Sequence, residues 1–109
     1  MSDTQQLIQK LVAFRDARDW AQFHNPKDLA AAISIEAGEL LELFLWKGAE
    51  EVAPEKVAQE LADVLAFAFL LADRCALDIG QILEEKMALN EQKYPVEKAR
   101  GSARKYNEL

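Results

Sequence analysis

The sequence has little of the chemistry on which many small proteins rely. Its 109 residues include one cysteine, one histidine, four glycines and three prolines. The single cysteine, Cys75, excludes an intramolecular disulfide and a zinc site built on cysteine pairs, and it fits a reducing compartment. We expect Cys75 to be a buried filler in an apolar helix. There is also no glycine-rich phosphate loop and no Gly-x-Ser-x-Gly motif, so the common P-loop and nucleophile-elbow chemistries are not indicated.

Positive charge and long apolar runs are also scarce. Thirteen Lys and Arg stand against nineteen Asp and Glu, which gives a net charge of −6. This balance argues against a nucleic-acid polymer as partner, because phosphate contacts need a basic surface. The longest apolar run, at 64–72, is too short to span a bilayer, so no membrane partner is expected. The first ten residues are not basic and then apolar, so we expect no signal peptide and a cytoplasmic location.

Apolar periodicity predicts an all-α fold in one domain that covers residues 1–109. Nothing in the sequence reads as a strand. Four helices are expected: Asp3 or Thr4 to Arg18, Pro26 to Trp46, Pro54 to Cys75, and Ile79 to Lys93. The expected end signals are Asp3 with Gln6, Asn25 before Pro26, Gly48 as a left-handed cap, and Asp78 with Gln81. The tail at 94–109 shows no strong period and is expected to be draped or partly mobile.

The third predicted helix is apolar almost all round from 64 to 72. A chain of this length cannot easily bury such a helix alone, so the sequence predicts self-association as a dimer or a dimer of dimers. The second and third helices are joined by a short loop and should pack antiparallel. The expected protomer is therefore an antiparallel four-helix-bundle-like unit with an extended C-terminal tail.

Four carboxylates on the two central helices are the most informative feature that is present. Glu36 and Glu39 on one helix, and Glu60 and Asp63 on the next, are each spaced i, i+3 and share a helix face. Glu36 falls inside the apolar stripe of its helix, where an acid is costly unless something compensates its charge. A hard cation such as Mg²⁺ is the natural compensator, with Mn²⁺ as the alternative ion. A carboxylate di-iron site is discarded, because the chain has no Glu-x-x-His pair.

The ordinary reading of these acids is a solvated helix surface, since Glu-x-x-Glu spacing is common there. A shared metal site also requires the two acid pairs to lie level in the helical hairpin. With a loop at 47–53, an antiparallel packing does not by itself bring the two acid pairs level. A longer loop or a modest helix shift is needed to align them.

Aromatic and basic residues flank the acids. Trp20, His24 and Trp46 would form a stacking pocket for a planar base beside a metal, although tryptophan more often packs at the edge of a core. Residues 93–109 hold five Lys or Arg and two acids. One helix face also carries a possible clamp for phosphate and sugar, made of Lys86, Asn90, Lys93 and Tyr94. The alternative for these cations is a solvated tail that pairs with the acidic body.

The chain resembles a known family at these same residues. Glu36-x-x-Glu39 followed by Glu60-x-x-Asp63 is similar to the signature of the MazG-like all-α nucleoside triphosphate pyrophosphohydrolases. Further segments resemble the dCTP pyrophosphatase branch of that family, namely Arg18-Asp19-Trp20, Phe23-His24, Trp46-Lys47, Lys93-Tyr94-Pro95 and Arg100-Gly101-Ser102. Many family members carry a second acid directly before the first metal ligand. Here that position is Ile35, which favours the small dCTP-type branch.

The resemblance implies a role for each group of residues. Glu36, Glu39, Glu60 and Asp63 would bind Mg²⁺. The resemblance does not identify the catalytic base, for which we expect a glutamate of the first pair, Glu36 or Glu39. The base pocket would be shaped by Trp20, His24 and Trp46, and the phosphates or sugar would be contacted by Lys86, Asn90, Lys93 and Tyr94. The implied reaction is hydrolysis of a (deoxy)nucleoside triphosphate, such as dCTP or a modified pyrimidine, to the monophosphate and pyrophosphate for pool sanitation. A non-enzymatic helical oligomerisation module remains the alternative.

Overall fold

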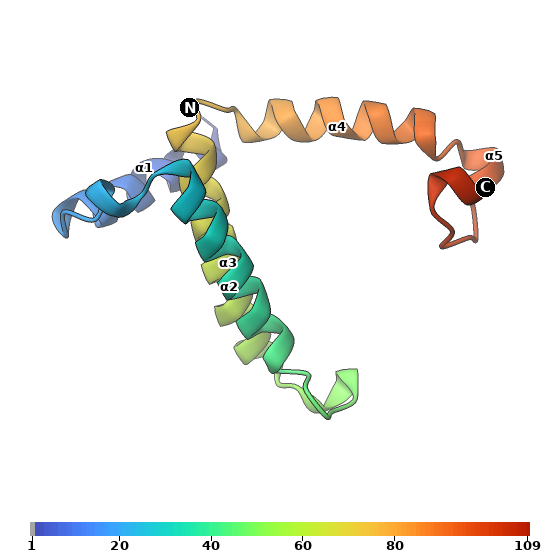
Figure 1. The fold of residues 1–109 in the computed structure, drawn as a ribbon, viewed down its shortest axis with the longest axis horizontal. Helices are drawn as coiled ribbons and strands as arrows, with labels where there is room; N and C mark the ends of the chain where they lie inside the picture. Colours follow the sequence, from blue (N-terminus) through green and yellow to red (C-terminus); the bar gives the residue numbers. More distant parts are fainter. Residues whose placement is uncertain (1) are drawn as a thin grey trace. The chain divides into compact units, whose positions relative to one another are not determined.

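The structure, a computed structural model, describes residues 2–109. Its contacts divide the chain into two compact units, one up to Leu77 and one from Asp78 to Leu109. The first unit holds α1 (Asp3–Ala17), α2 (Pro26–Glu42) and α3 (Pro54–Arg74), and the second holds α4 (Ile79–Lys93) and α5 (Val96–Ala99) (Figure 1). Short 3₁₀ turns lie at Ala21–Phe23, Ala49–Glu51 and Tyr106–Glu108. No strand occurs within 2–109, so the all-α prediction is confirmed.

Most helix starts lie where the sequence predicted them, with one correction. Asn25 caps α2 through its side chain, which accepts from the Asp28 N–H at 2.8 Å, and Pro26 opens the helix. Asp78 caps α4 by accepting from the Gln81 N–H at 2.9 Å. At α1, however, the capping box is made by Ser2 and Gln5, not by Asp3 and Gln6.

The end of α2 differs from the prediction. The helix ends at Glu42 instead of near Trp46. The backbone hydrogen bonds that follow connect residues three apart instead of four, such as the Phe44 N–H with the Leu41 carbonyl. Trp46, with φ of 63°, is the left-handed residue. Gly48, expected to have that role, has φ of −73°. A left-handed tryptophan is strained, because its Cβ crowds the backbone.

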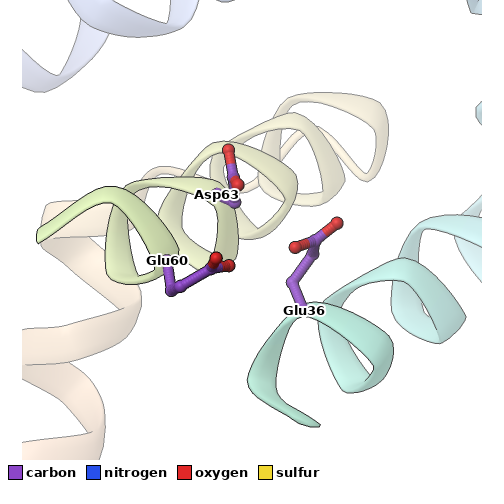
Figure 2. Close-up of side chains that lie close together, drawn as sticks. All are labelled: Glu36, Glu60 and Asp63. Atoms are coloured by element: carbon purple, nitrogen blue, oxygen red, sulfur yellow. The ribbon is translucent and has the colours of Figure 1, made fainter. Parts of the chain in front are cut away.

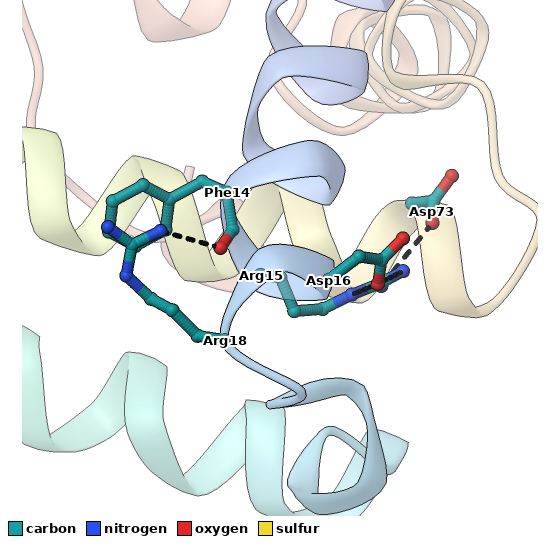
Figure 3. A network of polar contacts seen from close by, with 5 residues as sticks. All are labelled: Phe14, Arg15, Asp16, Arg18 and Asp73. Atoms are coloured by element: carbon teal, nitrogen blue, oxygen red, sulfur yellow. Dashed lines mark hydrogen bonds and ion pairs between the residues drawn. The ribbon is translucent and has the colours of Figure 1, made fainter.

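The core of the first unit lies between α2 and α3, which run side by side as an antiparallel hairpin (Figure 1). Only three apolar residues within 2–109 are buried, namely Leu29 on α2 with Leu70 and Ala72 on α3. The first helix, α1, also contacts α3, and an ion pair of 4.0 Å joins Arg15 to Asp73 across this contact (Figure 3).

Many large apolar side chains remain exposed on the central hairpin. On α2 and α3 they include Ile35, Leu41, Leu61 and Leu65. The prediction that this chain cannot cover its third helix therefore agrees with the exposure of Leu61 and Leu65 in the single chain. The predicted dimer or dimer of dimers stays a prediction. Cys75, expected in the interior, is exposed, because it lies beyond the last buried turn as the cap of α3.

The tail at 94–109 contains more regular structure than the sequence indicated. After α4 the chain forms the short helix α5, turns at Gly101 and ends in a 3₁₀ turn at Tyr106–Glu108. The rings of Tyr94 and Tyr106 meet edge to face with centroids 6.1 Å apart, so the two ends of the intervening loop are held together.

No helix among the described residues is long and apolar enough to cross a membrane.

Candidate metal centre

Three of the four predicted acids converge between α2 and α3. Glu36 extends from α2 toward Glu60 and Asp63 on α3 (Figure 2). One carboxylate oxygen from each of the three lies within 4.8 Å of the other two. Small adjustments of these side chains would let the three oxygens share one divalent cation.

The hairpin register explains this convergence. Because α2 ends at Glu42, the connection to Pro54 is longer than the loop expected from the sequence. Glu36 then lies six residues before the last residue of α2, and Glu60 lies six residues after the first residue of α3. Residues at equal distances from the turn of an antiparallel helix pair lie level. The longer loop is therefore what aligns the two acid pairs.

The cluster is partly withdrawn from water. Glu36 and Glu60 are half-buried, whereas Asp63 is exposed. The Oε2 atoms of Glu36 and Glu60 are both buried without a hydrogen-bond partner among the described residues. A buried carboxylate oxygen with no hydrogen-bond donor is unfavourable. Binding of a cation or a proton would therefore stabilise these two atoms.

Burial and mutual repulsion raise the pKa of two of these acids. For Glu36 the largest cause is desolvation, followed by a side-chain hydrogen bond with Glu39 and by the charges of Glu39, Asp63 and Glu60. Desolvation also leads for Glu60, followed by the charges of Glu39 and Asp63. Glu39, although exposed and outside the group of three, therefore acts on both half-buried glutamates. Within the described residues of the first unit, no cation is paired with the negative charge of this cluster.

The donor set fits a hard divalent cation. All its possible ligand atoms are carboxylate oxygens, Glu36 and Glu60 each have one unpartnered buried oxygen, and no Lys or Arg of the first unit forms an ion pair with the three acids. Oxygen-only sets of this kind suit Mg²⁺, Mn²⁺ or Ca²⁺ and not the softer metals. Glu36, Glu60 and Asp63 are the residues that would hold the ion, with Glu39 beside them.

The raised pKa values of Glu36 and Glu60 predict an unusual pH dependence of stability in the metal-free protein. Glu36 and Glu60 have folded-state pKa values above the ordinary 4.5. The native state therefore binds more protons than the unfolded state in this range, and stability falls as pH rises from about 4.5 through the raised pKa values. Thermal unfolding in EDTA between pH 4 and 7.5 would measure this. In the Glu36→Gln/Glu60→Gln double variant the slope should flatten, and an unchanged slope would contradict the assignment.

His24 lies close to the same face of α3. Its ring meets Phe67 edge to face with centroids 6.3 Å apart, and Phe67 lies one helical turn beyond Asp63. The Nδ1 atom of His24 is buried without a hydrogen-bond partner among the described residues. Of the three residues predicted for the base pocket, His24 is thus the one whose neighbour shares a helix with the acids.

The two tryptophans are placed differently. Trp20 meets Phe14 edge to face at 5.9 Å. Trp46 is 94 % exposed and packs against no core, so the alternative of a core-edge tryptophan fails for it. No ring–ring contact joins Trp20, His24 and Trp46 to one another among the described residues.

Two residues of interest were not singled out from the sequence. The guanidinium of Arg18 lies 3.6 Å from the centroid of the Phe14 ring and 5.9 Å from that of Trp20, and it donates to the Phe14 carbonyl (Figure 3). The Phe14–Arg18 spacing of i, i+4 is the signal that would have found it. Glu42 adds to the negative field at Glu60 and extends the Glu36, Glu39 spacing by another three residues.

The predicted phosphate clamp belongs to the second unit. Lys86, Asn90 and Lys93 lie on α4 at spacings that place them on one face, and Tyr94 caps this helix. The ammonium of Lys93 lies 4.9 Å from the centroid of the Tyr106 ring. Their part in substrate binding stays a prediction.

Comparison with known proteins agrees with this arrangement. Residues 31–109 match the model of the MazG-like family, and the chain belongs to that family. The dCTP pyrophosphatase 1 of Mus musculus is 44 % identical to it over 104 residues, which cover 88 % of this chain and 61 % of the relative. For dCTP pyrophosphatase 1 of Homo sapiens the identity is 42 %, with the same coverage of 88 % and 61 %.

A solved structure has a similar fold. The crystal structure of a pyrophosphatase from Archaeoglobus fulgidus superposes with a TM-score of 0.80 at 37 % identity, and the match covers 87 % of this chain and 94 % of that one. The chain thus spans nearly all of that structure but about three fifths, 61 %, of the curated relatives.

Proposed function

We propose that this protein is a Mg²⁺-dependent nucleoside triphosphate pyrophosphohydrolase with dCTP or a modified pyrimidine deoxynucleotide as substrate. The observation that carries the proposal is the group of Glu36, Glu60 and Asp63 with its two unpartnered buried oxygens. The relatives named dCTP pyrophosphatase support the choice of substrate. Mn²⁺ is the alternative ion.

In the proposed reaction, water attacks the α-phosphorus of the triphosphate. A new phosphorus–oxygen bond forms to water, the bond to the bridging oxygen breaks, and the products are the nucleoside monophosphate and pyrophosphate. When bound, Mg²⁺ supplies neutralisation of the phosphate charges and a more acidic water. Glu36, Glu39, Glu60 and Asp63 position the ion. Glu36 or Glu39 accepts the proton of the attacking water, and the raised pKa of Glu36 brings it closer to the working pH.

Substrate recognition is assigned to two further groups. His24, Trp20 and Trp46 offer rings for a planar base, and the exposed Trp46 has a free face for stacking. From α4, Lys86 and Lys93 offer cations, and Asn90 and Tyr94 offer hydrogen bonds to phosphate or sugar.

The proposal includes self-association as a homodimer or homotetramer. It is supported by the exposed apolar residues of α2 and α3, because such surfaces are normally covered. A cytoplasmic role in nucleotide-pool sanitation completes it, with no nucleic-acid polymer and no membrane as partner.

The test is pyrophosphate release from a panel of NTPs and dNTPs with and without Mg²⁺. We expect release from dCTP or its 5-substituted analogues that EDTA abolishes. Turnover of another nucleotide would keep the reaction and overturn the substrate.

The non-enzymatic oligomerisation module makes the opposite prediction. No turnover across the panel, together with a melting temperature that Mg²⁺ leaves unchanged, would overturn the proposed enzyme and favour the module.

A further inference from the structure

The loop between Tyr94 and Tyr106 concentrates positive charge in an acidic protein. We call residues 95–105 the basic loop. It contains four Lys or Arg and one acid, a net +3 in a chain whose net charge is −6. Within the second unit, Asp78 to Leu109, none of its cations forms an ion pair.

The basic loop is folded around an open depression of about 800 Å³. Its lining residues are Lys98, Gly101, Ser102, Ala103, Arg104, Glu108 and Leu109. A volume of this size is typical of sites for small ligands. All the residues that form it belong to the second unit, so the depression is a feature of this unit alone.

The lining offers hydrogen-bond donors that have no acceptor. The Ser102 hydroxyl oxygen accepts from the Arg104 N–H at 3.2 Å, which leaves the hydroxyl proton free to be donated outward. The backbone N–H groups of Gly101 and Ala103 find no acceptor among residues 2–109. Lys98 and Arg104 add charged donors. An anion with several oxygens would satisfy these groups together.

The backbone at Gly101 is shaped for this turn. Its φ is 75°, which side chains with a Cβ rarely adopt, and no atom within 4 Å would meet an added Cβ. The glycine is thus required by the backbone conformation and not by lack of space. The edge-to-face contact of Tyr94 with Tyr106, and the Lys93 ammonium over the Tyr106 ring, hold the two ends of the loop.

We propose that the depression in the basic loop binds the diphosphate group of the nucleotide or of the pyrophosphate product. No aromatic ring lines it, so it offers nothing on which a base would stack. Its donors suit phosphate oxygens, and Arg104 can donate two parallel hydrogen bonds. The inference deepens the proposed pyrophosphohydrolase and depends on it for the identity of the anion. It adds Lys98, Ser102 and Arg104 to the residues that recognise substrate.

The acidic side chain of Glu108 also lines the depression and provides a substitution whose expected effect has the opposite sign. Glu108 carries negative charge into the depression and must oppose a bound anion. Removing its charge should strengthen binding, whereas removing the charge of Lys98 or Arg104 should weaken it. A loop with only a structural role would not respond with opposite signs.

The experiment is titration of the full chain with inorganic pyrophosphate in EDTA, followed by calorimetry or ³¹P NMR. We expect Lys98→Gln and Arg104→Gln each to raise the Kd about tenfold, as for loss of one hydrogen bond to a charged group. Glu108→Gln should lower the Kd. The matched control is Lys10→Gln, which removes an exposed cation of α1 and should leave the Kd unchanged.

The outcomes separate this inference from the proposed function. Equal weakening by Lys10→Gln would mean a general effect of net charge and would overturn the site, as would unchanged binding in Lys98→Gln and Arg104→Gln. A comparison of pyrophosphate, dCMP and a non-hydrolysable dCTP analogue tells whether product or substrate is held. If the protein hydrolyses no nucleotide but binds pyrophosphate through these residues, the enzyme proposal fails and the anion site stands.

Discussion

Glu60→Gln should abolish nucleotide hydrolysis while leaving the protein folded. The glutamine keeps the size of the side chain but loses the negative charge, and an amide nitrogen that does not bind a hard cation replaces one carboxylate oxygen. Loss of a ligand that helps to hold a catalytic metal removes several kcal/mol of transition-state stabilisation, so we expect kcat/KM for dCTP to fall by about 10²-fold or more. Steady-state release of pyrophosphate at saturating Mg²⁺ measures it.

A control on the same helix makes this result specific. Glu55 lies in the first turn of α3 and is exposed, so Glu55→Gln removes the same charge outside the cluster and should retain activity. In EDTA the Glu60→Gln protein should be no less stable than the wild type, because the substitution removes a carboxylate that is repelled by its neighbours. A folded Glu60→Gln protein with full activity would contradict the metal-site assignment.

The acids of the candidate metal centre could be picked out from the sequence because their spacing within each helix is local information, whereas the alignment of the two pairs depends on the loop length. Spacings of i, i+3 fix which side of each helix the acids occupy, and the position of Glu36 within an apolar stripe predicts its partial burial. The structure confirms that Glu36 is half-buried and groups it with Glu60 and Asp63. Glu39 is the exception, since it acts on this group through its charge from an exposed position.

The end of α2 could not be predicted because the sequence continues its helical pattern past the true end. Leu43, Phe44 and Leu45 fit the apolar period, but their N–H groups bond three residues back instead of four. The left-handed turn then falls on Trp46, although Gly48 would adopt it at less cost. No local signal in the sequence marks this end of the helix.

The cap of α1 was mistaken for a different reason. Ser2 and Asp3 are both good capping residues, and each is followed three residues later by a glutamine. The sequence therefore holds two overlapping capping boxes, and the structure uses the earlier one. The basic loop was also underestimated, because the contact between Tyr94 and Tyr106 that orders it has no helical or strand period.

The same register that aligns the acids also builds the core. Seven residues before Glu36 the chain reaches Leu29, and seven residues after Asp63 it reaches Leu70, so two of the three buried residues lie two helical turns from the cluster. Leu29 is 1 % exposed. With so few buried side chains, each one contributes a large share of the packing that fixes how α2 sits on α3.

Leu29→Ala should therefore produce the largest loss of stability of any single substitution proposed for this chain. Truncating a fully buried leucine costs about 2–5 kcal/mol, because both transfer free energy and packing contacts are lost. For a domain of this size that corresponds to a fall in Tm of roughly 10–25 °C. Thermal and urea unfolding in EDTA measure the change without stabilisation by bound metal.

Leu41→Ala is the matched control, since Leu41 lies on the same helix but is 71 % exposed. In the single chain it should change stability by no more than about 0.5 kcal/mol. A loss at Leu29 below about 1 kcal/mol would contradict the core described for this hairpin. If Leu41→Ala instead proves costly, and its effect grows with protein concentration, the exposed face of α2 is covered by another copy. The hairpin that holds the metal ligands would then depend on assembly for its stability.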